Sequence, residues 1–224
     1  MTKDRKKLPV PADSAAAESK PVLTDPWFDK AMALLACAPL LFVLWINLEA
    51  RTFDLPRIVL VAQILLQVGP MFVRRAPLRV SHNPGLWIFS FVTTYWPFLV
   101  AVTAPHGPAL APQWVTTGLS LLGLSIFAFA RLSLGRSIGL VPALRGLVVH
   151  GAYSYVRHPI YSGAFLIYLV MGLTSYSLLN TALCIIGCVL YMIKSLIEER
   201  FLSADQTYRL YMQQVPWRWL PGVA

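Results

Sequence analysis

The residues with the richest chemistry lie in one short stretch in the second half of the chain. Between Arg145 and Gly163 the sequence reads RGLVVHGAYSYVRHPIYSG, which combines guanidinium, imidazole and phenol side chains with several glycines. Such groups can hold an anion, exchange a proton and present an aromatic face to a cation. The stretch is too polar and too aromatic for a plain linker, so it indicates a binding or catalytic site.

A second group of charged side chains follows after a long uncharged segment, and consists of Lys194, Glu198 and Glu199. The intervening residues 159–193 are apolar, with a short polar interruption near the middle, and predict a helical hairpin that begins near Pro159. A hairpin returns the chain to the face that it left, which brings Arg157 and His158 close to the second group. Lys194 and Glu198 are four residues apart and share one side of their helix.

Each of these residues alone has an ordinary explanation. Arg and Lys at helix ends often reach toward lipid headgroups, and a glutamate pair can be a solvated helix end. The convergence of acidic, basic and imidazole groups on one boundary favours a functional site instead. Residues 198–221 continue as an amphipathic segment that is expected to cover this site, with Trp217, Arg218 and Trp219 as interfacial anchors.

The elements that position these residues are predicted to be membrane-crossing helices. Of the 224 residues 57% are hydrophobic and 13% charged, whereas soluble domains carry roughly 25% charged residues. The uncharged stretches predict about six crossings, at residues 31–48, 57–73, 86–104, 112–131, 160–177 and 179–197. The predicted fold class is therefore all-α: a polytopic helical membrane protein with a C-terminal amphipathic helix.

The distribution of basic residues predicts the orientation of these helices. Every Lys and Arg except Arg51 and Arg57 falls in segments on one side of the six-crossing arrangement. By the positive-inside rule, both termini are then cytoplasmic. The net charge of +9 is explained by this topology and by contact with lipid headgroups, so no nucleic acid partner is expected.

Three regions follow from the same pattern. Residues 1–25 are polar and are expected to form a disordered cytoplasmic tail. Residues 26–130 form the N-terminal transmembrane helices, of which the first three carry almost no polar chemistry, and residues 131–224 carry the site. The sequence has no dinucleotide-binding glycine motif, no Walker loop and no metal-ligand spacing, so a metal is not expected and a nucleotide-like cofactor must bind outside a Rossmann domain.

In this order the motifs resemble the isoprenylcysteine carboxyl methyltransferase family and its phospholipid methyltransferase relatives. The matching elements are Gly151-Ala-Tyr153, Arg157-His-Pro-Ile-Tyr161 with Gly163, Glu198-Glu199 with Leu202, Tyr208 and Tyr211, and Val215-Pro216 with Pro221. They span residues 131–224. The resemblance implies a helical membrane fold that binds S-adenosylmethionine between the polar loop, the ends of the hairpin and the C-terminal helix.

By position, the resemblance also implies the roles of individual residues. The implied cofactor-binding residues are Arg145, Gly146, Leu147, Val148, Tyr153, His158, Pro159, Ile160, Tyr161 and Glu198, and the implied catalytic residues are Arg157, Lys194 and Glu199. Glu198 would face the charged methionine portion of the cofactor, and Lys194 the substrate. The chain departs from the family at Lys194, where eukaryotic members have Arg, and at Asp205-Gln206, where Phe-Gly is frequent.

The predicted activity is S-adenosylmethionine-dependent methyl transfer, at the cytoplasmic membrane face, to a lipophilic acceptor of the isoprenylcysteine carboxylate type or a related lipid. A carboxylate acceptor is ionised at pH 7 and needs only Lys194 or Arg157 to hold it. An amine acceptor needs deprotonation, for which Glu199 or His158 are candidates. Two other functions stay open: an NADPH-dependent reductase of sterols or other isoprenoids, whose members carry a related Arg-His-Pro element, and a non-enzymatic membrane scaffold.

Overall fold

The structure, a computed structural model, describes residues 25–49, 55–103 and 107–223. The predicted tail lies almost entirely outside this part of the chain. Arg51, one of the two basic residues predicted to lie on the opposite side from the others, also lies outside it.

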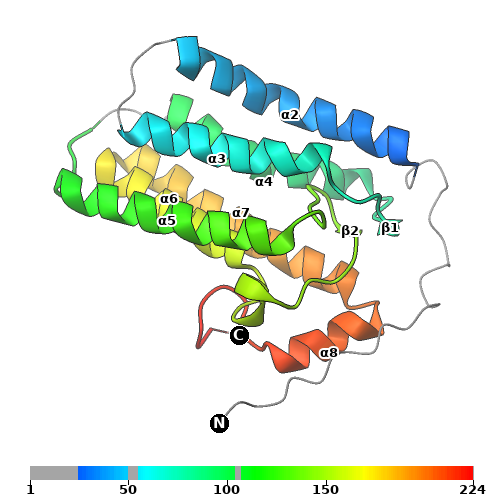
Figure 1. The fold of residues 1–224 in the computed structure, drawn as a ribbon. Coiled ribbons are helices and arrows are strands. Elements are labelled where there is room, and N and C mark those ends of the chain that lie inside the picture. The colour runs from blue at the N-terminus through cyan, green and yellow to red at the C-terminus, as the bar shows by residue number, and fades with distance from the viewer. Residues whose placement is uncertain (1–24, 50–54, 104–106, 224) are drawn as a thin grey trace.

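The fold is a bundle of long helices (Figure 1). The helices are α2 (Pro26–Glu49), α3 (Leu55–Phe72), α4 (Pro84–Thr103), α5 (Gln113–Leu134), α6 (Pro159–Thr174) and α7 (Leu178–Leu202). Each predicted crossing coincides with one of these helices, and α6 begins at Pro159 as expected. The mostly helical fold is thus confirmed. In the described part of the chain, α5 and α7 are long and apolar enough to cross a membrane, while Val61–Phe72 and α6 form shorter apolar helices.

The helices pack around a common centre. The closest pairing is α5 with α6, and α5 also packs on α3, whereas α7 packs on both α4 and α6. The outer helix α2 contacts α3. Because α6 packs on both α5 and α7, the polar ends of the hairpin and the C-terminal end of α5 face one region of space.

The smaller elements gather at one end of the bundle (Figure 1). Strand β1 (Arg79–Val80) pairs antiparallel with β2 (Ala143–Leu144), a short two-stranded ladder that the sequence did not predict. The 3₁₀ turn η1 (Gly151–Ser154) and helix α8 (Gln206–Gln214) lie at the same end. Together these elements close the end of the bundle where the hairpin begins and finishes.

The predicted amphipathic segment 198–221 is divided into three parts. Residues 198–202 are the end of α7, residues 206–214 form α8, and the remainder is irregular, with bends and a turn. Asp205 caps α8, because its side chain accepts hydrogen bonds from the backbone N–H groups of Thr207 (2.7 Å) and Tyr208 (3.3 Å). The departure from the family pattern at Asp205 therefore starts a helix.

Candidate active site

A cavity of about 610 Å³ lies between the helices at this end of the bundle. Pockets that bury small-molecule ligands have volumes of about 300–1,000 Å³. The predicted site residues that line it are Arg145, Gly146, Leu147, Val148, Tyr153, Arg157, His158, Ile160, Tyr161, Lys194 and Glu198. Pro159 and Glu199 are predicted site residues that do not line this cavity. The structure therefore brings nearly all of the predicted set around one space.

Glu198 faces the cavity within an aromatic cage. The Tyr161 hydroxyl donates a 2.8 Å hydrogen bond to Glu198 Oε1, and His158 Nδ1 lies 3.9 Å from Oε2. The Tyr161 ring stacks on His158 at 5.2 Å and meets the edge of Tyr191 at 5.0 Å between ring centroids. A carboxylate held beside stacked aromatic faces can bind a ligand cation. Its side chain is 21% exposed, so a ligand in the cavity can reach it.

Glu199 points away from the cavity and joins three elements. Its Oε1 accepts from Arg157 Nε at 2.6 Å and lies 3.2 Å from His158 Nε2, while its Oε2 accepts from Arg218 Nε at 3.0 Å. The carboxylate is buried, with 5% of the side chain exposed. Glu199 thus links the end of α7 to the start of α6 and to the C-terminal segment.

The C-terminal segment is bound to the start of α6 by backbone as well as side-chain contacts. The Arg157 guanidinium donates to the carbonyl oxygens of Val215 (2.9 Å) and Pro216 (2.6 Å). The backbone N–H groups of Arg157 and His158 donate to the carbonyls of residues 217 and 218. We refer to residues 215–219, held in this way, as the C-terminal strap.

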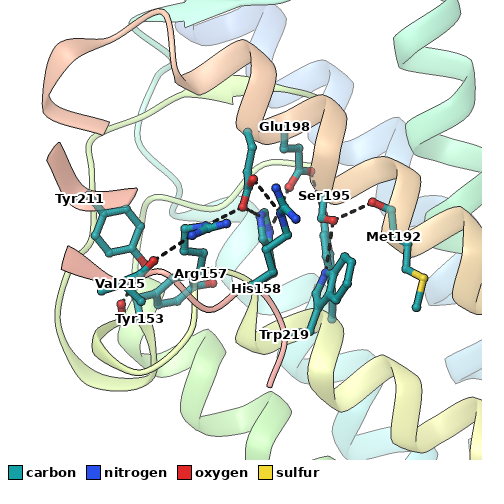
Figure 2. Close-up of polar contacts among 12 residues, drawn as sticks. Tyr153, Arg157, His158, Met192, Ser195, Glu198, Tyr211, Val215 and Trp219 are labelled. Atoms are coloured by element: carbon teal, nitrogen blue, oxygen red, sulfur yellow. Dashed lines mark hydrogen bonds and ion pairs between the residues drawn. The ribbon is translucent and has the colours of Figure 1, made fainter. Parts of the chain in front are cut away.

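Two strap residues, which the sequence pattern predicted as anchors at the membrane interface, have partners within the protein. Trp219 Nε1 donates to Ser195 Oγ at 3.2 Å (Figure 2). The Trp219 ring also packs edge-on against Phe165. Arg218 pairs with Glu199. Intramolecular packing therefore uses Trp219 and Arg218, which the sequence pattern had assigned to the membrane interface.

The loop that carries Gly146, Leu147 and Val148 is fixed by a buried ion cluster. Arg145 binds Asp29 with both terminal nitrogens, at 2.6 and 3.0 Å, and Arg74 binds the same carboxylate at 2.8 Å. Burial opposes ionisation of Asp29, but hydrogen bonds and charge from Arg145 and Arg74 outweigh it and lower its pKa below the usual value. The Arg145 guanidinium is thus committed to Asp29, which lies in α2.

Two glycines allow the loop and η1 to approach the cavity. Gly146 lines the cavity and has a φ of 101°, a backbone conformation that residues with a side chain rarely adopt. Gly151 has a φ of 60°, and a Cβ there would lie 2.3 Å from Ser133 Oγ in α5. The backbone conformation of Gly146 and the close contact of Gly151 with α5 therefore both favour glycine.

Tyrosines from η1 and α8 form the wall at the end of the cavity. Tyr153, Tyr208 and Tyr211 all line it, and the Tyr211 hydroxyl donates to the Tyr153 carbonyl at 2.8 Å. Burial raises the pKa of each of these three phenols. They are therefore neutral near pH 7 and offer aromatic faces and hydroxyl donors.

Part of the cavity wall was not predicted from the sequence. Helices α2 to α5 contribute Val43, Gln63, Gln67, Thr94, Pro97, Phe98, Phe127 and Arg131. The expectation that the first three crossings carry almost no polar chemistry was wrong, because Gln67 and Thr94 hold the side chains of Arg131 and Lys194. The sequence does contain one indication of this polar wall. Gln63 and Gln67 are four residues apart in an apolar stretch and therefore share one side of their helix.

The site combines a polar end, a wall of tyrosines and an apolar depth. Among the described residues, no group of three His, Cys, Asp or Glu side chains could hold a metal ion. Such an arrangement suits the binding of a polar ligand next to a lipophilic one, at one end of a helical bundle.

A comparison with protein families finds a match that covers the hairpin and its neighbours. Residues 112–209 match the phospholipid methyltransferase family, a range that runs from the residue before α5 into α8 and includes Arg157, Lys194 and Glu198. The matched region is thus similar to the family that the sequence motifs resembled. A comparison with curated proteins gives no match.

Proposed function

We propose that the protein is an S-adenosylmethionine-dependent methyltransferase that modifies a lipophilic acceptor, of the isoprenylcysteine carboxylate type or a related lipid. The observation that carries this proposal is the single cavity in which Glu198, the aromatic cage and an apolar depth meet. The family match of residues 112–209 supports methyl transfer as the reaction. A lipophilic acceptor is supported by the apolar side chains in the cavity wall, including Phe98, Ile167 and Met171.

We further propose that the chain crosses the membrane six times with both termini and the site on the cytoplasmic side. The apolar lengths of α5 and α7 support this arrangement. Large apolar side chains also point outward around the bundle, such as Phe42, Ile88, Phe129, Leu169 and Ile185. Soluble proteins seldom expose large contiguous apolar patches. Arg136 and Arg200, at the site end, suit the headgroup region of the cytoplasmic leaflet.

The residues at the polar end fit S-adenosylmethionine. Glu198 would bind the ammonium of its methionine portion, and the faces of Tyr153, Tyr161 and Tyr191 would lie near its cationic sulfur. The left-handed backbone of Gly146, followed by Leu147 and Val148, offers peptide groups and apolar surface to the adenosine portion. When bound, the cofactor supplies an electrophilic methyl group on a sulfonium.

The chain's own contribution to the reaction is alignment. Bringing two reactants into line can account for several orders of magnitude in rate, so no acid–base dyad is required for an acceptor that is already ionised. Lys194, which faces the cavity one turn before Glu198 on α7, would orient such an acceptor. An amine acceptor would need to lose a proton, for which the cavity-facing His158 is the candidate.

Arg157 and Glu199 act in this proposal as positioning residues. Arg157 Nε is bound by Glu199, and one of its terminal nitrogens is bound by the strap carbonyls. Glu199 is surrounded by Arg157, His158 and Arg218. Their role is to hold α6, α7 and the strap so that His158 and Glu198 face the cavity.

Calorimetric titration of the detergent-purified protein with S-adenosylhomocysteine tests the cofactor. We expect S-adenosylhomocysteine to bind and NADPH not to bind, because the cavity offers one carboxylate and aromatic faces for a cation. Binding of NADPH, with no binding of S-adenosylhomocysteine, would contradict the proposal and favour the reductase. Circular dichroism of the same sample verifies that the helices are intact.

A further inference from the structure

Two buried cations line the cavity. Arg131 on α5 is 7% exposed and Lys194 on α7 is 5% exposed, and both line the cavity. Neither has a carboxylate within 4 Å in the part of the chain that the structure describes. Buried charges are ordinarily paired, so this arrangement requires an explanation.

The protein partners of these cations are neutral and incomplete. Lys194 Nζ donates to Thr94 Oγ1 at 3.1 Å, and Arg131 donates to the Gln67 side-chain oxygen. Arg131 Nε is buried and has no hydrogen-bond partner. An ammonium has three donors and a guanidinium five, so both side chains retain donors for a ligand.

We propose that Arg131 and Lys194 form a subsite for an oxyanion, carboxylate or phosphate, attached to the long apolar chain of the acceptor. The inference rests on the proposed methyl transfer and adds to it a specificity residue, Arg131, together with the charge class of the acceptor. It applies to a part of the cavity distinct from the polar end at Glu198.

The order of residues along the helices places this subsite. On α7, Lys194 precedes Glu198 by one turn, and Tyr191 precedes Lys194 by a further turn. On α6, the cavity-lining residues run from Tyr161 near the helix start to Ile167 and Met171 further along. The oxyanion would lie between the carboxylate end of the cavity and its apolar depth, as expected for the headgroup of a lipid whose chain occupies that depth.

The local charge balance favours an anionic ligand. Glu198 acts through space on both Arg131 and Lys194, but it is hydrogen-bonded to Tyr161 and forms no ion pair with either cation. When Glu198 pairs with the ammonium of S-adenosylmethionine, no negative charge is left among the described cavity-lining residues to balance Arg131 and Lys194. An oxyanion from the acceptor would supply it, and the planar guanidinium of Arg131 suits two-point contact with carboxylate or phosphate.

The test compares charged and uncharged versions of one apolar probe. The fluorescent fatty acid cis-parinaric acid and its methyl ester are titrated into the full-length protein in a non-ionic detergent, at a pH where the acid is ionised. Energy transfer from tryptophan reports binding. We expect the wild type to bind the acid at least ~10-fold more tightly than the ester, since charge-assisted hydrogen bonds are the stronger class.

Variants assign this preference to the two cations. Arg131→Gln and Lys194→Gln should each reduce the preference by about tenfold, whereas Arg131→Lys, which keeps the charge, should retain most of it. Arg200→Gln is the matched control, because Arg200 is an exposed cation on α7 that does not line the cavity. The preference in Arg200→Gln should equal that of the wild type.

Competition distinguishes the sources of the oxyanion. Lysophosphatidate should displace the probe, and this result would show that the subsite accepts lipid phosphates. Inorganic phosphate at the same concentration should not displace it, because the apolar chain contributes to binding. Equal affinity for acid and ester, or an unchanged preference in both glutamine variants, would overturn the inference. Binding of S-adenosylhomocysteine by the same samples is measured separately. If the wild type does not bind it, the methyltransferase proposal is contradicted, whatever the result for the acid and the ester.

Discussion

Neutralising Glu199 should release the strap and destabilise the closed end of the bundle. The carboxylate is 5% exposed and contacts Arg157, His158 and Arg218 at 2.6, 3.2 and 3.0 Å. In Glu199→Gln the amide cannot compensate two guanidinium charges, so these cations lose their counter-charge. Breaking a buried pair by removing one partner costs about 3–5 kcal/mol. Because the Arg218 side chain is 27% exposed and screened by solvent, we take the lower value, about 3 kcal/mol.

For a chain of this length, about 3 kcal/mol corresponds to a decrease in apparent Tm of roughly 6–12 °C. Thermal unfolding in detergent, followed by circular dichroism, measures this shift. Glu49→Gln is the control, because Glu49 is an exposed acid at the end of α2, and such substitutions change stability by less than about 0.5 kcal/mol. Faster trypsin cleavage at Arg218 in Glu199→Gln would show that the strap is the part released.

A double-mutant cycle tests whether the effect passes through the contacts named. Since Arg218 acts on Glu199 directly, Arg218→Gln should destabilise the wild type more than it destabilises Glu199→Gln. A loss below about 1 kcal/mol in Glu199→Gln, or strict additivity of the two substitutions, would refute the reasoning that Glu199 joins α6, α7 and the strap.

Three further substitutions test other parts of the site. Glu198→Gln keeps a hydrogen-bond acceptor for Tyr161 but removes the negative charge. Calorimetry should therefore show at least about tenfold weaker binding of S-adenosylhomocysteine. An unchanged Kd would show that Glu198 does not bind the cofactor. Asp29→Asn should lower apparent Tm by several degrees, because two buried guanidinium groups lose their counter-charge; an unaltered Tm would show that the cluster does not hold the loop. Asp205→Ala removes the α8 cap and should cost about 1 kcal/mol in thermal unfolding, and a cost near zero would show that packing alone fixes α8.

The sequence predicted the helices and the convergence of the hairpin ends well. Long uncharged runs define helices almost independently of their surroundings, and a hairpin has to return Lys194 and Glu198 to the level of Arg157. The start of α6 followed from Pro159, whose fixed φ and missing N–H suit the first turn of a helix. These features depend on local sequence, which is why they could be predicted.

The contacts between distant segments could not be predicted in this way. Glu198 and Glu199 are adjacent in sequence, yet one faces the cavity and the other the strap, because successive residues on a helix point about 100° apart. The partner of Arg145 is Asp29 in α2, 116 residues away along the chain. Nothing local to either residue indicates that pairing.

The most direct test of the central claim is transfer of a radioactive methyl group. Full-length protein in lipid nanodiscs is incubated with S-adenosylmethionine carrying a tritiated methyl group and a membrane lipid extract, and radioactivity is counted in the organic phase. The account predicts lipid-soluble product with the wild type and at least about tenfold less with Glu198→Gln. Absence of labelled lipid from wild-type protein that binds S-adenosylhomocysteine, or equal labelling by Glu198→Gln, would contradict it.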